Sequence, residues 1–229
     1  MRITSLHAPV RKHLRQQGVG IIELLIGVAL GLVVVSGIIG LFVSAYANSR
    51  TMALENRVNQ ELRSAAELIS RDLRRSGYWA NAINGTIASG VSSSTAINPH
   101  VNTIASTNAI SYSFSQDAND TLDANEQFGF RLNGSVLEMQ TTDGTWTEIT
   151  NGNLLTISTF TITPRVTALP VGSVCPTACD LTSSTCPRLT VRQYDLLIRA
   201  NATSKPEITR ELRSSIRMRN EQFTGVCPL

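Results

Sequence analysis

The sequence predicts an α+β protein in which a long N-terminal helix, transmembrane and then amphipathic, packs on an antiparallel β-sheet head. Residues 24–43 contain only one polar side chain, Ser36. Residues 54–73 place apolar side chains at helical spacing. Beyond residue 107, apolar and polar residues alternate with the period of two that is typical of strands. Together these patterns favour one long helix followed by a separate β-rich head.

The composition argues against catalysis. The 229 residues leave room for one domain plus extra segments, and the net charge of +3 does not by itself indicate nucleic-acid binding. Two of the three histidines lie within the first 13 residues, so chemistry that needs several histidines is disfavoured. The sequence has no Walker A loop, dinucleotide-binding fingerprint or nucleophile elbow. We therefore expect no enzyme activity, no catalytic residues and no cofactor.

The apolar run has the length of a membrane span. Twenty residues rise about 30 Å in a helix, the thickness of the hydrocarbon core of a bilayer. Residues 1–18 carry four basic residues and no acidic one, so the positive-inside rule leaves the N-terminus in the cytoplasm. A cleaved signal peptide fits poorly, because its apolar region is shorter and ends in a small-residue cleavage site. On hydropathy alone, a plain signal anchor remains open.

Glu23 argues against the plain anchor. This carboxylate follows Ile21 and Ile22 at the edge of the apolar run, where an unpaired charge is costly. Cleavage after Gly18 would create a new amine at Val19, one helical turn from Glu23 in the same or a neighbouring chain. The arrangement of basic leader, Gly18, four mostly apolar residues, Glu23 and an apolar run resembles a type IV prepilin signal.

The resemblance implies a processing and assembly pathway. A prepilin peptidase would cut after Gly18 and N-methylate Val19, and Glu23 would pair with an N-terminal amine during assembly. Residue 19 is Val where the family usually has Phe, which leaves methylation efficiency open. The expected segments are a leader (1–18), a hydrophobic transmembrane and assembly helix (19–46), the amphipathic half of that helix (47–77) and a periplasmic head (78–229).

Leu54, Val58, Leu62, Ala65, Ile69 and Leu73 form the apolar stripe of the amphipathic half. We expect this stripe to pack on the sheet, although a solvent-exposed coiled-coil linker remains an alternative. Gly77 predicts the end of the helix. Arg71, Arg74 and Arg75 near that end favour interaction with the helix dipole over a nucleic-acid or partner patch.

Two further segments resemble one particular group of pilins. Residues 74–79 (RRSGYW) and 214–220 (SSIRMRN) resemble the helix end and the closing strand of PilW-type minor pilins, which are similar to J-type pseudopilins of type II secretion. This resemblance implies a minor pilin near the pilus tip, with roles such as twitching, adhesion or DNA uptake. A J-type pseudopilin and an uncut, signal-anchored periplasmic binding module remain alternatives.

The resemblance also implies the partners and the location. The partners would be other minor pilins, the major pilin, prepilin peptidase and, before assembly, the inner membrane; nucleic acid is not indicated. The subunit would lie in the inner membrane with a periplasmic head and then in a filament on the cell surface.

The head is expected to form one antiparallel sheet. A weak strand is expected within 80–107, and alternation predicts strands around Ile110, at 128–132 and at 136–140. Asn133 and Gly134 predict a two-residue hairpin turn. Residues 154–163, 189–199 and 208–218 supply later strands; the last also fits a helix, but its composition favours strand.

Cys175, Cys179, Cys186 and Cys227 predict two disulfides in an oxidising compartment, with Cys227 tied back to the 175–186 loop. Three pairings are possible. Zinc binding fits poorly, because no histidine lies near these cysteines.

The acidic stretch 117–126 places Asp117, Asn119 and Asp123 at positions 1, 3 and 7 of a weak calcium-loop pattern. Leu122 and Phe128 stand where such a loop needs Gly and Glu, so a solvated acidic hairpin loop is favoured and no metal site is expected. His100 is expected to lie in a surface loop.

Overall fold

The computed structural model describes residues 18–85, 98–183, 185–225 and 227–228. The chain divides into two compact units, Met1–Thr51 and Met52–Leu229. Helix α1 (Ile21–Arg75) belongs to both of them. Leader residues 1–17 lie outside the described residues.

In the N-terminal unit, α1 begins directly after three residues without regular structure. Among the described residues, α1 is the one helix that is long and apolar enough to cross a membrane. Its apolar side chains are exposed throughout the run, from Leu24 (61%) to Phe42 (70%).

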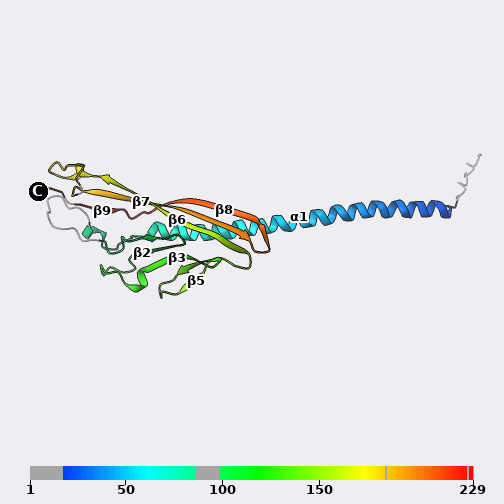
Figure 1. Ribbon diagram of the computed structural model, residues 1–229, viewed down its shortest axis with the longest axis horizontal. Coiled ribbons are helices and arrows are strands. Elements are labelled where there is room, and N and C mark those ends of the chain that lie inside the picture. Colours follow the sequence, from blue (N-terminus) through cyan, green and yellow to red (C-terminus); the bar gives the residue numbers. More distant parts are fainter. Residues whose placement is uncertain (1–17, 86–97, 184, 226, 229) are drawn as a thin grey trace, which may run out of the picture. The chain divides into compact units, whose positions relative to one another are not determined.

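In the second unit, α1 buries one stripe against the sheets, as the periodicity predicts. Val58, Leu62, Ala65, Ile69 and Leu73 are buried. They belong to one apolar cluster with residues of both sheets. Figure 1 shows this half of α1 running alongside the strands of the head. This confirms packing on the sheet and rules out the alternative of an exposed linker for this half of the helix.

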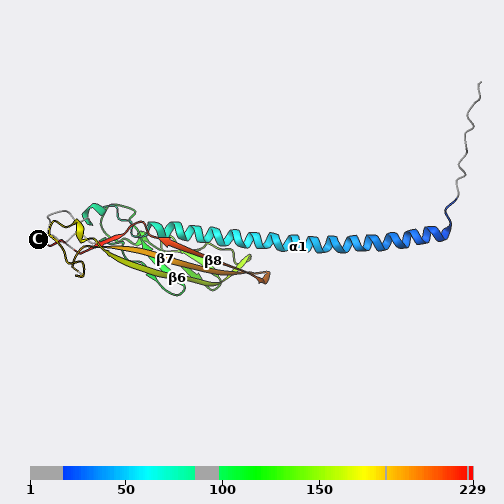
Figure 2. The ribbon, with the colours of Figure 1, turned by 90° about the horizontal axis from the view of Figure 1, so that it is seen from above.

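The head contains two antiparallel sheets, whereas the sequence predicted one. The five-stranded sheet has the order β1 (Ile104–Ala105), β2 (Ala109–Ser113), β3 (Gln127–Asn133), β4 (Val136–Gln140) and β5 (Trp146–Glu148). The four-stranded sheet is built from β6 (Leu155–Pro170), β7 (Arg188–Ala202) and β8 (Lys205–Arg217), with β9 (Gln222–Thr224) also paired to β7. Figure 2 shows β6, β7 and β8 running side by side. Three short 3₁₀ helices, η1 (Ala82–Gly85), η2 (Ala124–Glu126) and η3 (Gly172–Val174), complete the described elements.

Two local predictions have definite outcomes. Residues 205–217 form strand β8, so the preference for strand over helix is confirmed. The β3–β4 turn lies one residue later than predicted, because Asn133 pairs with Val136 and leaves Gly134 and Ser135 as the loop. Gly134 has φ +59°, as a glycine at the first central position of such a loop allows.

Candidate functional site

The residues predicted to guide processing and assembly lie together at the start of α1. Gly18 and Val19 precede the helix, and Glu23 lies in its first turn. A carboxylate there interacts favourably with the positive end of the helix dipole. Among the described residues, no cation lies within ion-pair distance of Glu23. The carboxylate can therefore accept a cation from another chain.

The apolar run satisfies its own polar groups and offers small residues to a neighbour. The Ser36 hydroxyl donates to the Leu32 carbonyl at 2.7 Å, so the run exposes no unpaired side-chain donor. Added Cβ atoms at Gly27 and Gly31 would meet nothing within 4 Å, and the same holds for Gly37 and Gly40. No contact among the described residues requires these glycines, and small residues permit close helix approach in lipid.

The C-terminal end of α1 is closed by the segment that follows β8. Gly77 has φ +74°, a conformation that favours glycine, and terminates the helix. The Arg219 amide donates to the Arg74 carbonyl at 3.0 Å, and the Asn220 side chain donates to the carbonyls of Arg75 and Ser76. The fold thus joins segments 74–79 and 214–220, although 144 residues separate Asn220 from Ser76.

Arg192 of β7 is a buried residue that contacts the segment capping α1. Its side chain is 6% exposed and donates to the Val101 carbonyl and, at 2.9 Å, to the Asn220 carbonyl. Burial lowers the pKa of Arg192 from its usual value, and the nearby Tyr194 opposes that shift. The sequence analysis missed this residue, because an arginine inside an alternating strand carries no signal of burial.

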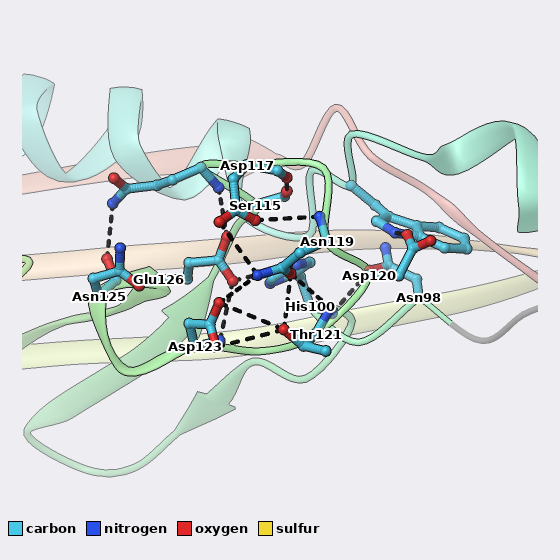
Figure 3. Close-up of polar contacts among 12 residues, drawn as sticks. Asn98, His100, Ser115, Asp117, Asn119, Asp120, Thr121, Asp123, Asn125 and Glu126 are labelled. Atoms are coloured by element: carbon cyan, nitrogen blue, oxygen red, sulfur yellow. Dashed lines mark hydrogen bonds and ion pairs between the residues drawn. The ribbon is translucent and has the colours of Figure 1, made fainter.

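His100 lies inside the head, so its predicted surface position is wrong. It is 1% exposed, and its Nε2 lies 3.7 Å from Oε2 of Glu126, which is equally buried (Figure 3). Glu126 accepts from the backbone N–H groups of Gln116 (2.6 Å) and Asp123 (3.1 Å). Burial lowers the pKa of His100, and the charges of Glu126, Asp117 and Asp123 oppose this shift only in part. The Ser/Asn-rich sequence around His100 indicated an exposed loop. Its burial could not be predicted, because the acidic loop that covers it comes later in the chain.

The acidic loop in front of His100 is held by its own side chains. The Asn119 amide donates to carboxylate oxygens of Asp117 (3.2 Å) and Asp123 (2.6 Å), as Figure 3 shows. Trp79 is 6% exposed and donates to Asp120 at 2.6 Å, which ties the loop to the helix end. An N–H donor thus lies between the carboxylates that a calcium ion would need. In the described parts of the chain, no three His, Cys, Asp or Glu residues are placed to hold a metal.

The four cysteines form two disulfides at one end of the four-stranded sheet. Cys227 pairs with Cys175 across a separation of 52 residues, which ties the C-terminal segment back to the loop as expected. Cys179 pairs with Cys186 across 7 residues.

The comparisons with known proteins identify the family. Residues 51–218, which cover the amphipathic part of α1 and most of the head, match the sequence model of prepilin peptidase-dependent protein B. No curated protein and no solved structure matches the chain. The chain belongs to the family of prepilin peptidase-dependent protein B and is a pilin-related protein.

Proposed function

We propose that this chain is a minor pilin of a type IV pilus, with an assembly role near the filament tip rather than a catalytic one. The observation that carries the proposal is the start of α1. Gly18 lies just before this helix, Glu23 lies in its first turn, and the apolar side chains that follow are exposed. The family name adds dependence on a prepilin peptidase.

The assembly mechanism follows from charge and solvation. The membrane holds the subunit by residues 24–43 after a prepilin peptidase has cut after Gly18 and methylated Val19. An unpaired carboxylate at membrane depth is costly, so Glu23 gains from pairing with the N-terminal amine of a neighbouring subunit. The apolar helix then moves from lipid into the helical core of the filament, where other minor pilins and the major pilin surround it.

The first test is the intact mass and N-terminal sequence of the protein purified from its native membrane. A chain that starts at Val19 and is heavier by one methyl group supports the pilin pathway. A chain that starts at Met1 refutes cleavage and makes the protein a signal-anchored periplasmic module.

The second test concerns Glu23 itself. The Glu23→Ala variant is expected to be processed normally but to be lost from filaments, because it removes only the pairing with the amine. The matched control Ser36→Ala is expected to assemble normally, because the Ser36 hydroxyl bonds only within its own helix. Normal incorporation of the Glu23→Ala chain would refute the pairing.

A J-type pseudopilin of type II secretion is the alternative that shares this mechanism. Deletion of the gene separates the two machines. Loss of surface filaments with intact protein secretion supports the pilus, whereas the reverse result supports the pseudopilus.

A further inference from the structure

An arginine-lined groove runs along the head between α1 and β8, with a volume of about 560 Å³. The helix wall comes from residues of its last four turns, and the opposite wall comes from β8 and the segment after it. The lining residues are Arg63, Ala66, Glu67, Ser70, Arg71, Arg74, Arg75, Leu212, Arg213, Ser214 and Arg219. All of them belong to the same compact unit.

Among the residues that the structure describes, β8 forms an unpaired edge of the four-stranded sheet, and this edge belongs to one wall of the groove. β8 pairs with β7 on one side and is the last strand in the order β6-β7-β8. Leu212, Arg213 and Ser214 are consecutive, and consecutive side chains of a strand point to opposite faces. Leu212 and Ser214 share the inner face and Arg213 belongs to the outer one, so a groove that all three line reaches the edge of the strand. An edge strand turns the backbone N–H and C=O groups of alternate residues away from its neighbour, so the groove contains both donors and acceptors.

The groove is strongly positive. Six arginines line it against one glutamate, and all six are exposed. Arg71 and Arg75 lie 3.8 and 3.4 Å from Asp72, and Arg213 pairs with Glu211 at 2.7 Å. Among the described residues, Arg63, Arg74 and Arg219 have no ion pair. The sequence favoured an interaction of the helix arginines with the helix dipole. The fold places Arg213 and Arg219 beside them, and an interaction with the dipole does not explain these two residues.

We propose that this groove binds an extended acidic segment of a partner protein, which pairs with the edge of β8 as an added strand. Such a segment supplies the N–H and C=O groups that an edge strand needs, and its carboxylates meet the free arginines. A nucleic acid satisfies the chemistry less well, because its backbone phosphates accept hydrogen bonds and cannot donate to the edge carbonyls of β8 as a peptide backbone does. The partner is defined by charge, so the proposal does not depend on which machine the protein serves.

The chain itself does not supply this segment. Residues 1–17 and 86–97, which lie outside the described part of the chain, contain no Asp or Glu. The acidic loop 117–126 is held in place by its own hydrogen bonds and by Trp79. A second copy that paired edge to edge would add its own groove arginines to those of the first copy, and like charges oppose such pairing.

The test measures binding of a fluorescent ten-residue peptide of alternating Glu and Val to the full chain in mild detergent. The Arg63→Gln/Arg219→Gln variant, which removes one arginine from each wall, is expected to bind about tenfold more weakly, the combined effect of losing two solvent-exposed charge pairs. The matched control Arg57→Gln lies on the same helix, is also exposed and does not line the groove. This control is expected to change affinity less than about twofold.

Modified peptides separate strand pairing from simple charge attraction. N-methylation of alternate amides keeps every carboxylate but removes donors, so one of the two methylation registers is expected to weaken binding about tenfold. A peptide with Lys in place of Glu is expected not to bind. Equal binding of both methylated peptides, or equal loss in the Arg57→Gln control, overturns the proposal. So does a single-stranded oligonucleotide that binds more tightly than the peptide with the same dependence on Arg63 and Arg219.

Discussion

Replacing Gly77 by alanine tests how the head is joined to the end of α1. A Cβ atom at Gly77 would lie 2.9 Å from Nη2 of Arg192 and 3.7 Å from the carbonyl oxygens of Asn220 and His100. The guanidinium must therefore move, although it is buried and donates to two carbonyls. A left-handed conformation costs a residue with a Cβ about 1–2 kcal/mol, and a hydrogen bond to a charged group contributes about 1.5–3 kcal/mol. We expect the free energy of unfolding to fall by about 3 kcal/mol in total.

Gly134→Ala is the matched control, because Gly134 also has a left-handed φ of +59° but an added Cβ meets nothing within 4 Å. It is expected to cost about 1 kcal/mol. The assay is urea unfolding of each full chain in mild detergent, followed by tryptophan fluorescence, since Trp79 is buried in the head. Equal losses in the two variants would refute the role assigned to Arg192. No loss in either would refute the conformational argument as well.

Two further predictions concern the stability of the head, one on removing each disulfide and one on lowering the pH. Replacing Cys175 and Cys227 by serine opens a cross-link of 52 residues and is expected to cost about 4 kcal/mol, against about 2.5 kcal/mol for Cys179 and Cys186 with a separation of 7; equal costs in urea unfolding would contradict the chain-entropy account. Because burial lowers the pKa of His100 below its ordinary 6.5, the unfolded chain binds the proton more tightly, so stability should fall as the pH drops below about 6.5. The His100→Gln variant should show a flatter pH dependence in the same assay, and an unchanged slope would contradict this assignment.

The sequence predicted those features that local patterns determine. The stripe from Val58 to Leu73 has the helical period, and Gly77 is a local stop signal, so the helix and its buried face were correct. Alternation also located most strands. It does not say which strands pair, so the division of the head into two sheets between β5 and β6 escaped prediction.

The candidate sites show the same division between local and distant information. Glu23 could be proposed because Gly18 and the apolar run are its neighbours in the sequence, and its pairing stays a prediction. The pair formed by His100 and Glu126, and the groove that unites Arg63 with Arg219, depend on contacts between distant segments. No spacing within a single sequence reports such contacts.

The closure of α1 by Arg219 and Asn220 has a consequence for biosynthesis. The ribosome makes the carbonyl groups at the helix end about 145 residues before it makes the side chain that caps Arg75. Until Asn220 has been made, these carbonyls can accept hydrogen bonds from water instead of from its side chain. Contacts between residues so far apart in the sequence also form slowly. A chain that stops before Arg219 keeps the apolar helix but lacks the groups that cap its C-terminal end. The end of α1 is thus completed only after residues 219 and 220 have been made and have packed against it.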